Sequence, residues 1–411
     1  MTKEIVVSSS STQTLGIVEG DLVIGEEATV KGEGTPPKIN VTGTVHCKGN
    51  CMLDCSLSAE NMVGKGDITV NGDLEVRGYV SIRTWGFGKS SLNVLGSMSA
   101  KKVEVEAHLS VGKDFETEHV DVGGRILVKG KTKAQNIDVG GSFTGIGDVE
   151  AKLIDVGGSV TIESQANVEK LDVGGRAVVK GGRVGRVDVG GSFESKDSLE
   201  FDSIDVGGTV RLAGDSKGGN IDVGGSCKVD GDLQFGGIDV GGVVEITGSA
   251  KGESLDVGGI LRVGGSLQLS GKLDVGGRVE VEGDLSAGDV DVGGRLKAKG
   301  VTASNEVDVG GSITTTNGVS ALSVRIGTRG VVVGPLRADN LLIGERAHVE
   351  DVYGKDIIVE EKAHVRNLYG ERVNIESSCH ISGEVQYTES LKTEEDVFFA
   401  KPPTKVEKLP Q

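Results

Sequence analysis

Apolar residues come along this chain in pairs separated by one residue, and each pair is followed by another six positions later. In one copy the pairs are Leu255/Val257, Leu261/Val263 and Leu267/Leu269. This alternation points the apolar side chains to one side of a β-strand and the residues between them to the other. Three short strands in about 17 residues would make one triangular turn, and parallel strands of successive turns would pair about 4.8 Å apart. The pattern predicts an all-β fold, a single-stranded, three-faced parallel β-helix or β-solenoid.

The most regular part of the sequence is the tetrapeptide Asp-Val-Gly-Gly, led by Val, Ile or Leu, which recurs twelve times between Val120 and Gly311. The interval is 17 residues, with one of 16 and one of 18. A fixed short period is typical of stacked repeats, in which no single copy can bury its apolar face alone. The twelve aspartates are Asp121, Asp138, Asp155, Asp172, Asp188, Asp205, Asp222, Asp239, Asp256, Asp274, Asp291 and Asp308.

The same rhythm predicts how the chain is divided. It starts at Leu22, pauses in a corner loop at residues 32–37, where Pro36 and Pro37 could not sit within a central ladder, and ends near residue 386. We therefore expect a flexible tail at 1–20, N-terminal turns with loops at 21–119, the regular repeat block at 120–311, C-terminal turns at 312–386, a cap at 387–400 and a disordered Pro/Lys tail at 401–411.

Composition adds two expectations about the turns. Glycine makes up 67 of the 411 residues, more than twice the usual share of about 7%. We expect the glycines at corners that need a positive φ. Aromatic residues make up only 3%, which predicts a thin core that holds aliphatic side chains and rarely a ring.

The charge and the cysteine count limit the cellular compartments and the classes of partner that fit the sequence. A net charge of −17 argues against sequence-independent binding to nucleic acid or anionic lipid, because both need basic patches. The sequence lacks an apolar run of about 20 residues and the apolar lead of a secretory signal. Five cysteines in 411 residues form no disulfide framework, which is typical of a reducing compartment. We expect a cytoplasmic protein.

Three cysteines four residues apart, Cys47, Cys51 and Cys55, follow His46 and raise the question of a metal site. Their spacing does not fit the pairings of zinc sites well. Buried thiols that behave as small hydrophobic side chains fit better, and we expect no metal or cofactor. Four cysteines fall on inward positions of the pattern: Cys47, Cys51, Cys227 and Cys379.

Each Asp of the repeat lies between two inward residues, so the aspartates should form an outward row. Such a row could bind cations, by analogy with calcium-binding β-rolls, but the nine-residue repeat of those proteins is absent. The favoured alternative is that each Asp accepts hydrogen bonds from the amides of its own Gly-Gly corner, as in Asx turns.

After Gly311 the interval changes to 16 residues, and His348, His364 and His380 should form a second outward row. Stacked imidazoles could bind a metal, respond to pH or supply the catalytic His of a hexapeptide-type acyltransferase. That chemistry needs an acceptor pocket, and no long insertion near the histidines would build one. The favoured interpretation is a solvated face.

Residues 79–88, from Tyr79 to Gly88, contain the only tryptophan, Trp85, together with Phe87. Rings clustered between strands predict a loop on the outside of the solenoid. The loop is a candidate contact patch for a protein partner, and packing against the chain's own surface is the alternative.

These features resemble the bactofilins, polymer-forming cytoskeletal proteins of bacteria and archaea. The resemblance rests on hexad turns such as Leu-Leu-Ile-Gly-Glu-Arg-Ala-His-Val at residues 341–349, on tails flanking a solenoid and on the Pro/Lys-rich end. It implies a right-handed β-helix that assembles end to end, without nucleotide, into filaments or a scaffold. It also implies an occasional association with membranes, for which this sequence offers no support of its own. The chain is far longer than a typical bactofilin.

Three functional hypotheses follow. The sequence carries no phosphate-binding glycine loop, nucleophile elbow or convincing metal cluster, so we expect a structural protein and not an enzyme. The first hypothesis is a scaffold that self-associates through its terminal turns. The alternatives are a rod that does not polymerise and binds a protein or cations, and, less favoured, a trimeric acyltransferase.

Overall fold

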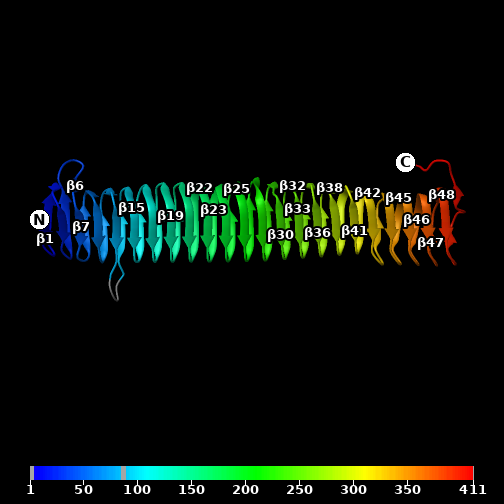
Figure 1. Cartoon of the computed structure of the whole chain (residues 1–411), viewed down its shortest axis with the longest axis horizontal. Helices are drawn as coiled ribbons and strands as arrows, with labels where there is room; N and C mark the ends of the chain where they lie inside the picture. Colours follow the sequence, from blue (N-terminus) through cyan, green and yellow to red (C-terminus); the bar gives the residue numbers. More distant parts are fainter. Residues whose placement is uncertain (1–3, 85–88, 411) are drawn as a thin grey trace. The chain divides into compact units, whose positions relative to one another are not determined.

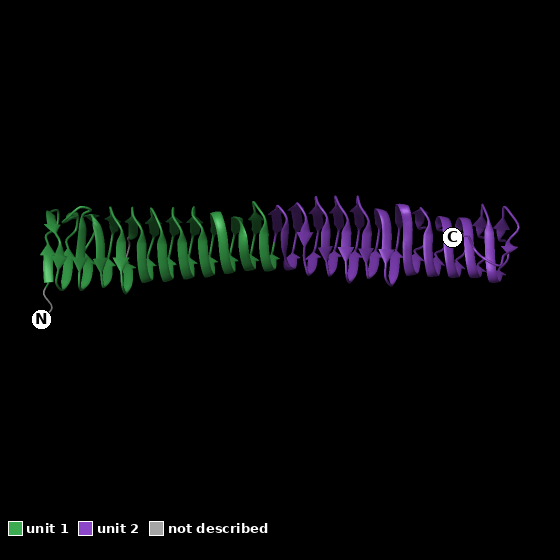
Figure 2. Cartoon of the chain, turned by 90° about the horizontal axis from the view of Figure 1, so that it is seen from above, with its two compact units in different colours: residues 1–207 green, residues 208–411 purple. Residues whose placement is uncertain are grey.

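The computed structural model describes residues 4–84 and 89–410. Every regular element within these two ranges is a β-strand, which confirms the predicted all-β class. In the part of the chain that the structure describes, no helix is long and apolar enough to cross a membrane. The chain divides into two compact units, residues 1–207 and residues 208–411 (Figure 2), and each unit is a parallel β-solenoid.

Each turn of unit 1 has three faces, which we call A, B and C. In one turn, β17 (Phe115–Val122) forms face C with its first half and face A with its second half, and β18 (Arg125–Val128) forms face B. The next turn begins 17 residues later and pairs in parallel, with Val120 opposite Ile137. Figure 1 shows how the turns stack within the unit. The aspartates of the repeat lie on face A.

The strands of unit 1 are short on faces that end in a tight corner and longer where faces C and A share one strand. They are β1 (Glu4–Val7), β2 (Thr12–Leu15), β3 (Ile17–Val18), β4 (Asp21–Ile24), β5 (Ala28–Gly32), β6 (Lys38–Val41), β7 (Thr44–Cys47), β8 (Cys51–Asp54), β9 (Ser56–Ala59), β10 (Asn61–Gly64), β11 (Asp67–Val70), β12 (Leu74–Val76), β13 (Tyr79–Ile82), β14 (Ser91–Val94), β15 (Met98–Val105), β16 (His108–Val111), β17, β18, β19 (Thr132–Val139), β20 (Ser142–Gly145), β21 (Val149–Val156), β22 (Ser159–Val173), β23 (Arg176–Val189), β24 (Ser192–Ser195) and β25 (Leu199–Val206).

Unit 2 repeats the same plan. Its strands are β26 (Thr209–Ala213), β27 (Ser216–Val223), β28 (Ser226–Asp230), β29 (Leu233–Gln234), β30 (Gly237–Val240), β31 (Val243–Ile246), β32 (Ala250–Gly252), β33 (Ser254–Val257), β34 (Ile260–Val263), β35 (Leu267–Leu269), β36 (Lys272–Val275), β37 (Arg278–Val281), β38 (Leu285–Ala287), β39 (Asp289–Val292), β40 (Arg295–Ala303), β41 (Glu306–Val309), β42 (Ser312–Ile326), β43 (Val331–Val333), β44 (Leu336–Ile343), β45 (His348–Val359), β46 (His364–Ile375), β47 (His380–Ile381), β48 (Val385–Thr393), β49 (Phe398–Phe399) and β50 (Thr404–Lys405).

The core is the column of inward side chains from the three faces, as the alternating pattern predicts. It is mainly aliphatic and holds a few rings, as the sequence predicts. Phe115, Phe143 and Phe193 are among the largest fully buried side chains. One further ring, Phe235, fits because the next turn offers a glycine at the matching inward position. A Cβ atom added to Gly252 would overlap the ring of Phe235.

The Gly-Gly corners between faces A and B are built differently from the expectation. No glycine of the repeat is among the glycines with positive φ. A Cβ atom added to Gly158 or Gly294 would instead overlap the carbonyl oxygen of the corner glycine one turn earlier. Glycine is needed there because successive backbones approach too closely for any side chain, and not because the backbone is left-handed.

The two irregular intervals are absorbed without changing which side chains face inward. In the 16-residue interval, the pairing of β22 with β23 shifts between Ile162 and Gln165. In the 18-residue interval, the pairings of β33 with β36 and of β35 with β38 contain no shift. The extra residue therefore lies between strands. A one-residue slip inside a strand would turn its apolar side chains outward, and both adjustments avoid that.

The ends of the chain differ from the flexible tails and the cap that the sequence suggests. In place of a tail, β1, β2 and β3 form a first turn that pairs with β4, β5 and β6. Residues 387–400 and 401–411 contain β49, paired with β47, and β50, paired with β48. These segments read as tails because a terminal turn is covered on one side only and so needs fewer apolar residues. The division into two units at residue 207 also falls inside the repeat block.

Candidate functional site

The first turn of unit 1 has strand edges open to pairing. Strands β1, β2 and β3 pair only with β4, β5 and β6 among the described residues, so their outer edges carry unpaired backbone groups. Two apolar side chains are exposed here: Val6 is 61% exposed and Ile17 is 75% exposed. Ile5 lies on an inward position yet stays half-buried, because nothing in the described chain stacks above it. An open parallel edge with apolar side chains is a template for another chain.

The last turn of unit 2 is open in the same way. Its face A is the end of β48, from Ser390 to Thr393, which pairs only with β46. Its faces B and C are β49 and β50, each with one partner in the described chain. Leu391 points inward but is half-buried, and Phe398 is 52% exposed.

The corners between faces A and B at both ends share a conformation that the middle turns lack. It is a left-handed backbone at one non-glycine residue, with φ between 53° and 61°. Few residues other than glycine adopt this conformation. The residues are Ser10 and Glu27 in the first two turns, and Arg329, Arg346, Lys362, Ser378 and Asp396 in the last five.

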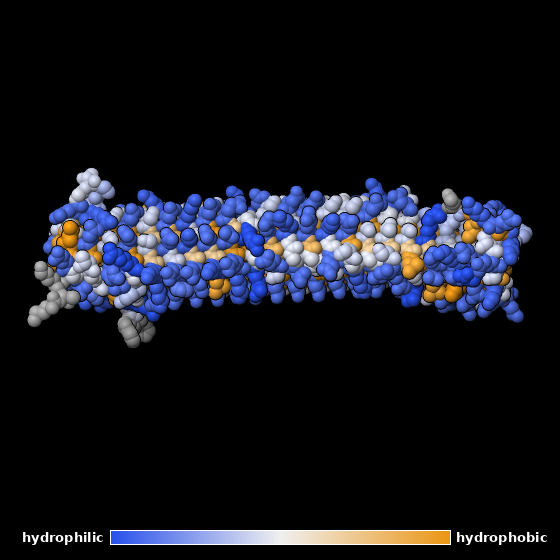
Figure 3. All heavy atoms as spheres, turned by 45° about the horizontal axis from the view of Figure 1, so that its top comes forward, coloured by the Kyte–Doolittle hydropathy of each residue, from blue (hydrophilic) through white to orange (hydrophobic). Residues whose placement is uncertain are grey.

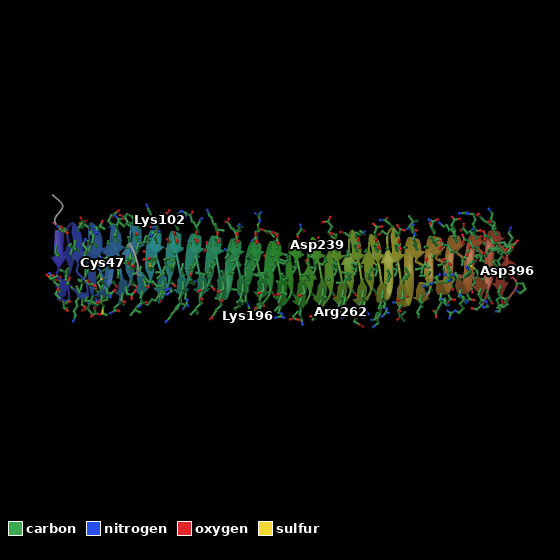
Figure 4. The ribbon with its side chains drawn as sticks, turned by 90° about the horizontal axis from the view of Figure 1, so that it is seen from below. Cys47, Lys102, Lys196, Asp239, Arg262 and Asp396 are labelled. Atoms are coloured by element: carbon green, nitrogen blue, oxygen red, sulfur yellow. The ribbon has the colours of Figure 1, made fainter. Side chains whose placement is uncertain are left out.

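The hydrogen bonds of these corners have a direction. The amide of each left-handed residue donates to a carbonyl in the following turn, as Ser10 does to Glu26 (2.8 Å) and Ser378 does to Glu395 (3.2 Å). Asp396 has no following turn in the described chain, so its amide points out of the last turn. Figure 4 labels Asp396 at this end.

On face B the direction is reversed. The amide of Thr29 donates to the carbonyl of Ser11 in the turn before (2.9 Å), and the amide of Phe398 donates to Cys379 (2.9 Å). Thr12 holds the same position as Thr29 one turn earlier. Its amide therefore points out of the first turn, where no described residue accepts it.

The aspartates of the repeat stack in register, as predicted, with Asp138 paired to Asp121 and Asp155. Each unit carries six of them, and Figure 4 shows Asp239 among the outward side chains. Partial burial, followed by the charges of Asp121 and Asp155, raises the pKa of Asp138 above its ordinary value. The carboxylates therefore repel one another along the row.

The expected hydrogen bonds from the Gly-Gly amides to the aspartates are not the ones that these amides form. Gly140 donates its amide to the carbonyl of Val122 (3.0 Å) and Gly157 donates to Val139 (3.0 Å), each one turn earlier. These amides donate to the backbone of the preceding turn, because stacking places a carbonyl opposite each amide.

A second set of aspartates, which the sequence analysis missed, has the corner role instead. These residues precede face C. Asp73 accepts a hydrogen bond from the amide of Ser97 (2.8 Å), and Asp114 accepts one from Lys131 (2.8 Å). In unit 2, Asp232 accepts from Ser249 (2.7 Å). For Asp73 and Asp232 the sequence signal is the dipeptide Gly-Asp before an apolar residue, at residues 72–74 and 231–233, whereas Lys113 precedes Asp114.

The three histidines form the predicted outward row. The rings of His348 and His364 stack with centroids 4.5 Å apart, His380 continues the row at 5.5 Å, and Phe398 stacks on His380 at 4.4 Å. Burial and then the charges of His348 and His380 lower the pKa of His364. The stack thus favours the neutral form of the His364 imidazole.

The lowered pKa of His364 gives a testable pH dependence. The folded chain binds this proton less tightly than the unfolded chain, so the stabilisation is complete above the ordinary pKa of about 6.5 and is lost as the pH falls below it. We expect the urea midpoint of the wild-type protein to fall modestly between about pH 7.5 and pH 5. His364→Phe keeps the stack and should weaken that fall. An equally steep fall in the variant would show that the histidine row is not its source.

The cysteines confirm the predicted inward positions, since all five are buried and none forms a disulfide. The thiols of Cys47 (labelled in Figure 4) and Cys51 lie 3.1 Å apart. Their hydrogen bond and burial raise the pKa of Cys47 well above its ordinary value, and burial raises the pKa of Cys227 to about 12. Within residues 4–84 and 89–410, no group of three or more His, Cys, Asp or Glu side chains is placed to hold a metal ion.

The contact patch predicted at residues 79–88 is described only in part. Tyr79 begins β13 and is 45% exposed. Trp85 and Phe87, on which the prediction mainly rested, lie outside the described residues.

Unit 2 also has a basic hollow of about 620 Å³, which we call the arginine hollow. Arg278, Arg295 and Arg329 line it, above corner glycines that leave the space open. Arg278 contacts Glu280 at 3.7 Å, whereas no ion pair of Arg295 or Arg329 is found among the described residues. Figure 3 shows that rows of polar side chains otherwise cover most of the visible surface.

Two features of the described chain are therefore candidate sites: the open edges of the terminal turns, and the arginine hollow. Comparison with family models, with curated proteins and with solved structures gave no match.

Proposed function

We propose that this protein is a structural scaffold whose copies assemble end to end, without nucleotide, through their terminal turns. The observation that carries the proposal is that β1–β3 and the strands of the last turn each pair on one side only within the described chain. The solenoid fold is compatible with this role, and the resemblance of residues 341–349 to bactofilins supports it. Five free, buried cysteines suit a reducing cytoplasm, which we propose as the location.

Joining two terminal turns would satisfy groups that each end leaves open. Ile5 and Leu391, half-buried on inward positions, would become core residues. Burying apolar surface contributes about 25 cal/mol per Å², and the paired backbone groups would no longer depend on water. The same forces hold successive turns together within each unit, so assembly needs no nucleotide.

The first test removes one outward backbone donor. Thr12→Pro deletes an amide that has no acceptor in the described chain, so folding should be retained, as for proline on edge strands. End-to-end assembly should weaken by about ten-fold or more, since a lost pairing and a steric clash together cost on the order of 1.4 kcal/mol or more. Sedimentation velocity and negative-stain electron microscopy would measure it.

Thr12→Val is the matched control, because it alters the side chain and keeps the amide. It should assemble like the wild-type protein. If the wild-type protein stays monomeric over the full range of protein and salt concentrations, or if Thr12→Pro assembles as well as Thr12→Val, assembly through this edge is wrong.

The runner-up function is a rod that does not polymerise and binds a partner. The arginine hollow favours it specifically, because three guanidinium groups gather there in a chain whose net charge is −17. Arginine pairs well with carboxylates, so the partner would be an acidic protein segment. This function would be favoured over the scaffold if the wild-type protein is monomeric and binds an acidic peptide, and if the Arg295→Glu variant does not bind that peptide.

A further inference from the structure

The shared corner conformation of the first and last turns bears on how two copies would meet. Resting on the proposed function, we infer that the last turn of one copy stacks on the first turn of the next, so that the assembly is polar and continues the solenoid in register. The occupant of each open end is thus the opposite end of a second copy of this chain.

The hydrogen-bonding direction at the corner selects this arrangement. The last turn presents a donor there, the amide of Asp396, because each left-handed residue donates to the following turn. The first turn presents an acceptor, the carbonyl of Ser9, since the matching residue Glu26 accepts from Ser10 (2.8 Å). Two first turns would bring carbonyl against carbonyl at this corner, and two last turns would bring amide against amide. Only the last turn on the first pairs donor with acceptor.

Face B obeys the same rule with the opposite direction. Thr29 and Phe398 each stand two residues after a left-handed corner residue, and each donates its amide to the turn before. Thr12 holds this position in the first turn, two residues after Ser10 and paired with Thr29. Across the junction it would donate to the carbonyl of Val397, just as Phe398 donates to Cys379 (2.9 Å).

The corner shape of the two ends matches. Consecutive turns share the left-handed corner from Arg329 to Asp396 at one end and from Ser10 to Glu27 at the other, and Glu27 also donates to Asn50, in a turn without this corner. The middle turns have Gly-Gly corners that approach too closely for a side chain. The open last turn thus presents the same corner as the turn it would meet.

The proposed register fixes which side chains lie opposite each other. Val6 pairs with Val23 on face A of the first two turns, and Lys392 pairs with Asn374 on face A of the last two. The two rows coincide at the junction, so Val6 of one copy would lie opposite Lys392 of the next. Both side chains are exposed. Their Cα atoms would be about 4.8 Å apart, within the span of a disulfide.

Cysteine cross-linking tests the polarity. Val6→Cys and Lys392→Cys are prepared as separate full-length variants, mixed, and oxidised under conditions where the wild-type protein assembles. The inference expects a covalent dimer in the mixture at least ten-fold more abundant than in either variant alone. Val23→Cys, one turn further in, replaces Val6→Cys as the matched control and should give no dimer with Lys392→Cys. Non-reducing electrophoresis and mass spectrometry identify the linked residues.

Each other outcome has a distinct meaning. A dimer of Val6→Cys alone would show first turn against first turn, and a dimer of Lys392→Cys alone would show last turn against last turn. Either result overturns the polar junction and leaves end-to-end assembly standing. Filaments without any cross-link overturn the register, and a second pair, Thr12→Cys with Phe398→Cys, checks that result. A wild-type protein that never assembles overturns the proposed function and this inference with it.

Discussion

Replacing Phe235 with alanine should lower the free energy of unfolding of its part of unit 2 by about 3–5 kcal/mol, the usual cost of removing a buried ring. Phe235 is nearly fully buried, and its ring fills the inward position that Gly252 leaves empty one turn later. Hydrogen exchange of amides in the adjacent turns would measure the loss, because it reports local opening and does not require a repeat array to unfold in one step.

The partner glycine supplies the control. In the wild-type protein, Gly252→Ala should cost about 1–3 kcal/mol, since its Cβ atom overlaps the ring and overpacking costs that much. In the Phe235→Ala background the same change should cost almost nothing, because the ring is gone. A double-mutant cycle isolates this coupling, and costs that simply add would show that the ring does not occupy the space above Gly252.

The second large effect concerns the Gly-Gly corners. Gly294→Ala should destabilise its turn by about 1–3 kcal/mol, because the new methyl group would overlap the carbonyl oxygen of Gly277. Backbone cannot move aside as a flexible side chain can, so the two turns must separate and their hydrogen bonds lengthen. The midpoint of urea unfolding and the exchange of amides near the corner would both register the change.

Gly237→Ala is the matched control in the same unit. Its Cβ atom would first meet the Ser254 hydroxyl at 3.4 Å, an ordinary contact, and its φ is not positive. We expect it to be neutral or slightly stabilising, because alanine restricts the unfolded chain more than glycine does. Equal losses in the two variants would mean that close backbone approach is not what the corner glycines provide.

The sequence predicted the repeating part of the fold well, for a physical reason. Strand alternation and a 17-residue period act on the same residues twelve times, so Leu255 and Val257 could be placed inward without any tertiary information. The buried rings could not be placed in this way. Whether Phe235 fits depends on Gly252, a residue in another turn whose relevance appears only when the turns are stacked.

The terminal turns resemble tails in sequence because their inward positions are weakly apolar. Gln13, which pairs with the buried Val30, lies in β2, and Ser11 directly precedes this strand. The left-handed corners were missed because Glu27, Arg346 and Lys362 are not residues that usually mark such a backbone. A signal was nevertheless present: residues 25–30 read Gly-Glu-Glu-Ala-Thr-Val and residues 344–349 read Gly-Glu-Arg-Ala-His-Val.

Rows of side chains were easier to predict than their chemistry. The 16-residue spacing sufficed to align His348, His364 and His380, and the alternation sufficed to turn the aspartates outward. The aspartates do not accept hydrogen bonds from their own corner amides, because these amides donate to carbonyls of the preceding turn. The sequence of a single repeat does not show the carbonyl groups of the preceding turn.

The uniform corners of the repeat block have an evolutionary consequence. The turns around Asp239, Asp256 and Asp291 present nearly the same backbone to the turn before and to the turn after. No contact in the repeat block therefore depends on the number of repeats. Inserting or deleting one period of the sequence would add or remove a whole turn and preserve every inward position. Selection can therefore lengthen or shorten the molecule in steps of one turn while both terminal turns stay unchanged.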